Sequence, residues 1–100
     1  MPNLDPSTLE VKHNPDAKRF EIALPDGSLA LVDYNRAGNN IVYTHTEVPT
    51  QYEGNGIGGK LAHHVMEYAK QEGLKVQALC PFIAHYVREH EEYQSITWKQ

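Results

Sequence analysis

Apolar and polar residues alternate through the first half of the chain, which is the pattern of half-buried β-strands. The clearest case is residues 20–24 (FEIAL), whose large apolar side chains share one face. Proline and glycine in residues 25–28 (PDGS) predict a tight turn. The β-rich segment 29–34 should therefore pair back on residues 20–24 as a hairpin.

Two further segments extend this hairpin into an antiparallel meander. A short strand is expected over residues 10–13, before the turn signal NPD at 14–16. After a second turn at 36–40 (RAGNN), residues 41–48 alternate again. By period-2 alternation, one face of this last strand should carry Ile41, Tyr43, His45 and Glu47.

The pattern changes after Pro49 from strand to helix. Helical spacing relates the apolar residues Ile57, Leu61, Val65 and Tyr68. Gly73 stands where a helix C-terminus favours a residue without a Cβ, and residues 74–79 read as a short strand. A strand, a helix and another strand in this order predict a parallel, right-handed crossover.

A second helix is expected to begin at Pro81, because proline suits the first helical position. Its buried side should carry Phe82, Ile83, Tyr86, Val87 and His90. The tail 93–100 could add a last strand, and the leader 1–9 is expected to be loose. The fold class is therefore α+β: an antiparallel β-meander, a parallel β-α-β crossover and a C-terminal helix, in one domain spanning residues 1–100.

Composition excludes several classes of function. The 100 residues carry 13 acidic and 9 basic side chains, and a net charge of −4 argues against a nucleic-acid binder. No apolar run is long enough to span a membrane, and residues 1–10 do not resemble a signal peptide. The single cysteine, Cys80, excludes an internal disulfide and fits a reducing compartment. We therefore expect a cytoplasmic protein that is a monomer or a weak homodimer.

The segment 51–60 (QYEGNGIGGK) places four glycines directly before the helical pattern. Glycine costs about 1 kcal/mol in a helix interior, so this segment is not ordinary helix. A helix N-terminus presents free backbone N–H groups and a partial positive charge, and glycines let an anion approach them. We interpret the segment as an anion-binding loop; a merely flexible loop is the alternative.

Two nucleotide motifs match this loop only superficially. The pattern G-x-G-x-x-G at 54–59 is that of dinucleotide-binding folds, but the strand that follows the helix ends without the expected acid. The pattern G-x4-G-K is most of a P-loop, but Leu61 replaces the Ser or Thr that binds magnesium. Neither motif has its structural context here.

A third reading of the loop is Q-x-x-G-x-G at residues 51–56, directly after a strand and opening a helix. At this point the chain resembles the GNAT superfamily of N-acetyltransferases, and in particular a compact subgroup of about 100 residues. The resemblance covers roughly residues 10–95. Its further marks are HTEVP at 45–49, CPFI at 80–83, HYV at 85–87 and YQ at 93–94.

The resemblance implies an N-acetyltransferase with acetyl-CoA as cofactor and an amine as acceptor. In such proteins the loop amides hold the coenzyme A pyrophosphate, and the pantetheine arm lies between the strands corresponding to 41–48 and 74–80. The implied cofactor-binding residues are Thr46, Glu47, Val48, Gln51, Glu53, Gly54, Asn55, Gly56, Ile57, Gly58 and Gly59.

Acetyl transfer to an amine needs a neutral nucleophile, a contact for the oxyanion and a proton for the departing thiolate. Backbone N–H groups at the end of strand 41–48 could supply the oxyanion contact. His45 and Glu47 lie beside the loop, and either could act as the base, directly or through water. The alternative is that both are solvated structural residues.

Cys80 is a further catalytic candidate because it ends a strand and caps the second helix, where the helix dipole favours a thiolate. With an imidazole in reach, an acetyl-cysteine intermediate is possible; otherwise Cys80 lines the acetyl pocket or is a small buried apolar residue. By resemblance, Tyr86 would donate a proton to the thiolate, although it also reads as a core aromatic. The histidines at 63, 64, 85 and 90 lack the spacing of a metal site, so no metal is expected.

Two other functions stay open from the sequence. One is an acyl-CoA-binding or regulatory module with little transferase activity, and the other is a nucleotide-binding interaction domain. Full-sized superfamily members carry additional N-terminal helices that shape the acceptor groove, whereas only residues 1–9 precede the first strand here. The acceptor side is therefore expected to be open or completed by a partner. A protein lysine, an N-terminus and a polyamine all fit, and the net negative charge favours a cationic acceptor.

Overall fold

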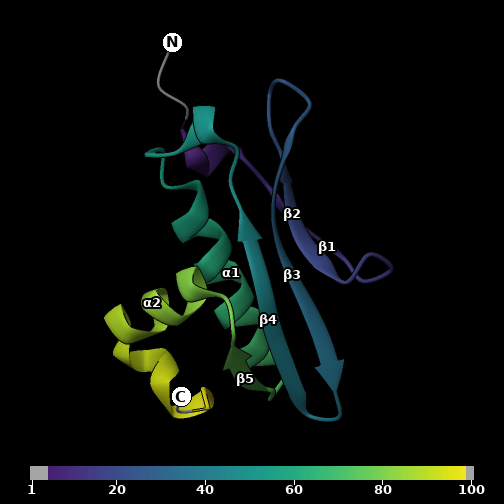
Figure 1. The fold of residues 1–100 in the computed structure, drawn as a ribbon, viewed down its shortest axis with the longest axis vertical. Helices are drawn as coiled ribbons and strands as arrows, with labels where there is room; N and C mark the ends of the chain where they lie inside the picture. Colours follow the sequence, from purple (N-terminus) through teal and green to yellow (C-terminus); the bar gives the residue numbers. More distant parts are fainter. Residues whose placement is uncertain (1–4, 99–100) are drawn as a thin grey trace.

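A computed structural model describes residues 5–98 of the chain (Figure 1). Its strands are β1 (Val11–Asn14), β2 (Arg19–Ala23), β3 (Leu29–Ala37), β4 (Asn40–Glu47) and β5 (Lys75–Ala78). Its α-helices are α1 (Ile57–Gln71) and α2 (Pro81–Glu89). Short 3-10 segments are η1 (Pro6–Thr8), η2 (Thr50–Tyr52) and η3 (Glu91–Ile96).

The strands form a single sheet in the order β1-β2-β3-β4-β5. The first four pair antiparallel with their neighbours, and β5 pairs parallel with β4 after the crossover through α1. The expected α+β fold, with a meander followed by a parallel crossover, is therefore confirmed. Within residues 5–98, neither α-helix combines the length and apolar character needed to cross a membrane.

The two helices lie on the same face of the sheet. Helix α1 contacts β2, β3, β4 and β5, and α2 contacts α1, β4 and β5. We call this the helix face; its buried side chains include Phe20, Ile22, Val32, Ile41, Tyr43 and Val76. The alternate residues of the strands point away from the helices, on what we call the open face, and include Glu21, Asp33, Asn35 and Gln77.

Helix α1 ends as its sequence predicts. Gly73 adopts a left-handed conformation with φ 68°. The N–H of Leu74 donates to the carbonyl of Ala69, and the N–H of Gly73 donates to the carbonyl of Lys70. These two bonds form a Schellman motif, which satisfies carbonyls that the helix end leaves without partners. The chain then turns directly into β5, so α1 and β5 are held antiparallel across the helix face.

The expected alternation along β4 is wrong in its second half. Tyr43 pairs with Tyr34 and His45 pairs with Asp33, so Thr44 is an additional residue that forms a β-bulge. Because the bulge shifts the phase of the side chains, His45 and Glu47 lie on the open face, opposite to Tyr43. Thr46, which pairs with Val32, lies on the helix face instead.

The tail differs from its prediction as well. Residues 91–96 form the 3-10 segment η3 where a last strand was expected. Its buried Tyr93 anchors the turn to α1, because the hydroxyl donates to the Glu67 carboxylate at 2.6 Å. Thr97 forms an isolated bridge to Val76 of β5, and the N–H of Trp98 donates to the Val76 carbonyl. Residues 99–100 of the expected strand lie outside the described part.

In the leader, residues 6–8 form the turn η1. The Asp5 carboxylate accepts hydrogen bonds from the backbone N–H and the hydroxyl of Ser7. Leu9 and Val11 then pack against the core. The first four residues of the leader that was expected to be loose lie outside the described residues.

Tyr43 joins the sheet to α1 through a buried hydrogen bond. Its side chain is fully buried, and its hydroxyl donates to the Val65 carbonyl at 2.6 Å. Burial raises the pKa of Tyr43 far above its ordinary value, so the hydroxyl keeps its proton. The bond fixes α1 over the point at which β4 bulges.

Replacement of this hydroxyl tests the contribution of the bond. Tyr43→Phe is expected to lower the free energy of unfolding by about 1 kcal/mol, measured by urea denaturation, because a buried hydrogen bond is lost. Tyr68→Phe is the control, since the half-buried Tyr68 makes no hydroxyl hydrogen bond within residues 5–98. Equal losses in the two variants would contradict this account.

Candidate functional site

The site begins where β4 and β5 separate. Their parallel ladder runs from Asn40 and Lys75 to Tyr43 and Ala78. Beyond it, the Tyr43 carbonyl accepts the N–H groups of both Leu79 and Cys80, each at 3.0 Å, and the two strands diverge. Strand β4 stays paired with β3 up to Glu47 (Figure 1). The end of β4 therefore has a strand neighbour on its β3 side only.

A cavity of about 420 Å³ lies at this diverging end. It is bounded by the end of β4, the loop that follows, the first turn of α1 and the first turn of α2. The lining residues are Thr46, Val48, Tyr52, Glu53, Gly54, Gly56, Ile57, Gly58, Gly59 and Phe82. The cavity thus combines the glycine-rich loop with the gap between the two parallel strands.

Two glycines give the loop its shape. Gly54 and Gly56 have φ values of 86° and 79°, in the left-handed region that glycine adopts without a Cβ penalty. Gly56 is the N-cap of α1, and its carbonyl accepts the first helical bond, from the N–H of Lys60. The N–H groups of residues 57–59 therefore have no acceptor in the described chain, and the helix dipole adds positive potential there. This is the geometry of an anion site.

Gln51 and Asn55 hold the loop in place instead of lining the cavity. The Gln51 amide donates to the Asp26 carboxylate at 3.0 Å, which ties the loop to the β2–β3 turn. The Asn55 amide donates to the Tyr52 carbonyl at 3.0 Å, within the loop. Glu47, on the open face, is also absent from the lining. The other residues expected to bind the cofactor all line the cavity.

Phe82 and Tyr52 are lining residues that sequence reasoning missed. Phe82 was assigned to the buried side of its helix, but its side chain is 43% exposed and faces the cavity. A Cβ built on Gly58 would lie 2.7 Å from the Phe82 ring. Gly58 has no positive φ, so this ring contact, and not the backbone conformation, calls for a glycine there. The available signal was an aromatic residue in a first helical turn, next to a candidate nucleophile.

Cys80 lies beside the cavity as the N-cap of α2 and is 4% exposed. Its thiol donates to the Thr46 hydroxyl at 3.1 Å, across the gap between the diverging strands. The expected imidazole partner lies elsewhere: the His45 ring is on the open face, 58% exposed, with its Nε2 3.5 Å from the Glu47 carboxylate. The structure therefore joins Cys80 to Thr46, and His45 to Glu47.

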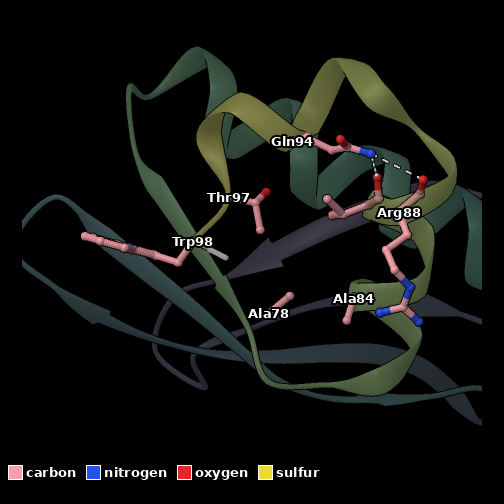
Figure 2. Close-up of a pocket in the computed structure, with 7 residues that line it drawn as sticks. Ala78, Ala84, Arg88, Gln94, Thr97 and Trp98 are labelled. Atoms are coloured by element: carbon pink, nitrogen blue, oxygen red, sulfur yellow. Dashed lines mark hydrogen bonds between the residues drawn. The ribbon is translucent and has the colours of Figure 1, made fainter. Parts of the chain in front are cut away.

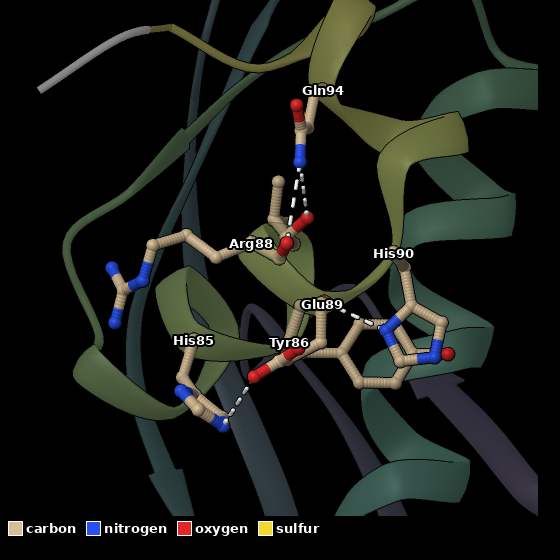
Figure 3. Close-up of polar contacts among 7 residues, drawn as sticks. His85, Tyr86, Arg88, Glu89, His90 and Gln94 are labelled. Carbon is tan, nitrogen blue, oxygen red and sulfur yellow. Dashed lines mark hydrogen bonds and ion pairs between the residues drawn. The ribbon is translucent and has the colours of Figure 1, made fainter.

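Tyr86 does not line the cavity. Its ring stacks on that of His90 with the ring centres 3.8 Å apart (Figure 3). The centre of the Tyr93 ring lies 6.1 Å from that of Tyr86. The His90 Nδ1 is 2.7 Å from the Tyr86 carbonyl, which fixes this stack. Burial, with the negative charges of Glu92 and Glu67, raises the pKa of Tyr86. Its packing is that of a core aromatic, and the proton-donor role stays a prediction.

A second cavity, of about 340 Å³, lies at the outer edge of β5 (Figure 2). Its lining residues are Ala78, Ala84, Val87, Arg88, Gln94, Thr97 and Trp98. The Gln94 amide donates to the Val87 and Arg88 carbonyls and joins α2 to η3 at its rim. The described residues that line this cavity include neither the first three residues of an α-helix nor the cysteine, so the loop cavity is the candidate site. Within residues 5–98, no cluster of three or more His, Cys, Asp or Glu side chains could hold a metal.

Known proteins share this arrangement of sheet, loop and helices. A family model described as GCN5-related N-acetyl-transferase matches residues 19–96, which include all of β2 to α2. The chain belongs to this family. The match contains the whole loop, the gap between β4 and β5, and Cys80.

Individual relatives extend the similarity over most of the chain. Protein NATD1 of Xenopus tropicalis is 33% identical over 95 residues, covering 90% of this chain and 85% of that protein. Protein NATD1 of Mus musculus is 35% identical, covering 85% and 84%. The NMR structure of a GCN5-like protein from Staphylococcus aureus superposes with a TM-score of 0.72 at 30% identity, covering 100% of this chain and 93% of that one. The minimal GCN5-related fold is thus shared from end to end.

The contact between Gly58 and Phe82 can be tested through stability. A Cβ added at Gly59 would meet no atom of residues 5–98 within 4 Å beyond its chain neighbours and its own helix backbone. Gly59→Ala should therefore stabilise the helix by up to about 1 kcal/mol. Gly58→Ala should stabilise less, because the Phe82 ring must leave its position. In a Phe82→Ala background the two substitutions should become equal, as urea denaturation would show. Equal effects without Phe82→Ala would disprove the contact.

The hydrogen bonds to the Asp26 carboxylate predict that the stability of the fold depends on pH. Hydrogen bonds from Ser28, and then from Gln51, lower the pKa of Asp26 from 3.8 to about 2. A carboxyl with a depressed pKa stabilises the fold above its unfolded pKa and loses this contribution as pH falls towards the folded value. Urea midpoints should therefore fall more steeply between pH 4 and pH 2 for the native chain than for Asp26→Asn. Parallel profiles would contradict the lowered pKa of Asp26 and the hydrogen bonds that cause it.

Proposed function

We propose that this chain is an acetyl-CoA-dependent N-acetyltransferase that acts on an amine. One observation carries the proposal. The left-handed glycines Gly54 and Gly56 direct the free amides of the α1 start into a cavity. The wall of that cavity, at Thr46, is hydrogen-bonded to Cys80 at the gap between β4 and β5. A site for a pyrophosphate and a path for a linear arm therefore meet in one place.

The residues present fit coenzyme A. The free N–H groups of residues 57–59 would hold the pyrophosphate. The first turn of α1 carries no acidic side chain, and Glu53 of the loop is the carboxylate in the cavity lining. Val48, Ile57 and Phe82 offer apolar surface for the pantetheine arm. When bound, acetyl-CoA supplies the acetyl group activated as a thioester. The lone cysteine and this cofactor make the cytoplasm the proposed site of action.

Cys80 fits a place beside the acetyl group better than a role as nucleophile. Cys80 is 4% exposed, and its thiol donates a hydrogen bond to the Thr46 hydroxyl, which is too weak a base to take the proton. The imidazole that was expected to take this proton lies on the opposite face of the sheet. We therefore favour direct transfer: the amine nitrogen attacks the thioester carbonyl, the carbon–sulfur bond breaks, and the amine loses one proton while the leaving thiolate gains one.

The acceptor is proposed to reach the gap from the open face, which neither α-helix covers. His45 and Glu47 lie on this face at the end of β4, so either can take the proton of the amine. Asp33 pairs opposite His45, and its carboxylate adds negative charge nearby. This environment suits a cationic amine, such as a lysine side chain or a polyamine.

The second candidate is an acyl-CoA-binding module without efficient transfer. The uncovered open face favours it, because no helix of residues 5–98 forms an acceptor groove there. The two candidates share the cofactor cavity and differ only on the acceptor side. Binding and transfer must therefore be measured separately.

Experiments with labelled acetyl-CoA distinguish a transferase from a binding module. We expect calorimetry to show coenzyme A binding, and we expect the native chain to move label onto a polyamine or a lysine peptide. Glu47→Gln or His45→Ala should slow transfer by at least about tenfold if the altered residue is the base, since general bases contribute about 10²–10⁴-fold. His85→Ala is the matched control, because its ring is similarly exposed, lies 3.8 Å from the Glu89 carboxylate and is not among the residues that line the cavity.

Cys80→Ala decides between the two routes. Direct transfer predicts that this variant keeps transfer within a few-fold of the native rate and that mass spectrometry finds no acetyl group on Cys80. Acetyl-Cys80 in the native chain, together with loss of transfer in the variant, would establish the covalent route instead. Binding without transfer to any amine would favour the second candidate. Absence of coenzyme A binding would overturn the proposal.

A further inference from the structure

Phe82 is an exposed aromatic residue in an unusual position. Its side chain is 43% exposed although it lies at the junction of two helices. Exposing an aromatic ring to water is unfavourable, and burying one is among the larger favourable terms in binding. The ring lines the loop cavity, so a ligand there would cover it.

The ring also lies between the two ends of the cavity. Phe82 follows Cys80 by two residues in the first turn of α2. On its other side, the ring contacts Gly58 in the first turn of α1, where the free amides are. A ligand that spans from these amides to Cys80 must therefore pass the Phe82 ring.

The glycines of α1 keep this contact close. A Cβ at position 58 would displace the ring. In the described part of the chain, a Cβ at position 59 would meet no atom within 4 Å apart from its chain neighbours and helix backbone. Both glycines have ordinary helical φ values, so neither is needed for backbone conformation. The absence of a side chain at Gly58 therefore allows the ring its position, and the absence of one at Gly59 leaves that part of the cavity open.

We propose, on the basis of the proposed function, that Phe82 is a positioning and specificity residue that packs against the pantetheine arm. It makes the cavity prefer ligands that carry this arm over the nucleotide half alone. The α1 amides attract any pyrophosphate, and they do not distinguish coenzyme A from a nucleotide diphosphate. The apolar ring supplies the distinction, because it has no donor for a phosphate oxygen and can pack only against the apolar arm.

Calorimetry with two ligands tests this role. The probes are coenzyme A and adenosine 3′-phosphate 5′-diphosphate, which is its nucleotide half. Phe82→Ala should raise the Kd of coenzyme A about tenfold and the Kd of the nucleotide half less than twofold. Phe82→Leu keeps an apolar wall and should recover most of the affinity. Trp98→Ala, which removes an aromatic side chain that is 51% exposed outside the loop cavity, should change neither value.

The outcomes separate this inference from the proposed function. If the native chain binds coenzyme A and Phe82→Ala weakens both probes by the same factor, Phe82 is only structural. An unchanged Kd for coenzyme A in Phe82→Ala would overturn the inference alone and leave the proposed function intact. No binding of coenzyme A to the native chain would overturn both. Because Phe82 is partly exposed, the variants should fold, which circular dichroism and thermal melts would verify.

Discussion

The divergence of β4 from β5 is the constraint on which the site depends. A carbonyl has two lone pairs, and the Tyr43 carbonyl uses both to accept the N–H groups of Leu79 and Cys80. These two hydrogen bonds to one carbonyl end the parallel ladder, and the chain then turns out of the sheet. Helix α2 then starts at Pro81, beside the start of α1 and not in line with β4. The cavity, the Cys80 cap and the position of Phe82 all follow from this turn.

The bulge at Thr44 places the candidate catalytic side chains of β4 on the face opposite to the cavity. Without it, His45 and Glu47 would share the helix face with Tyr43, and Thr46 would point away from the cavity. With it, Thr46 reaches Cys80 on the helix face, and the two titratable side chains lie on the open face. In the function we propose, groups from both faces meet at the gap between the strands: the cofactor approaches from one face and the acceptor from the other.

In the loop, side chains hold the structure together, whereas backbone N–H groups face the cavity. Gln51 and Asn55 use their amides to hold the loop to the β2–β3 turn and to itself. The glycines expose backbone N–H groups, which carry no sequence identity of their own. A side chain in a family motif can therefore be retained for the position of the loop, and need not touch the ligand. Phe82 is the converse case, because a residue outside the loop motif lies directly against it.

The sequence by itself determined the order and type of the elements, the end of α1 at Gly73 and the glycine-rich start of that helix. These features follow from short-range chemistry: side-chain periods, turn residues and helix caps act within a few positions. The tertiary structure alone decided the phase of β4, the partners of Gln51 and Cys80, the exposure of Phe82 and the 3-10 form of residues 91–96. Each of these depends on pairing with residues far away in the chain, as His45 depends on Asp33 and Tyr93 on Glu67. A bulge leaves no mark in a period-2 pattern, because it is set by the register between two strands and not by either strand alone.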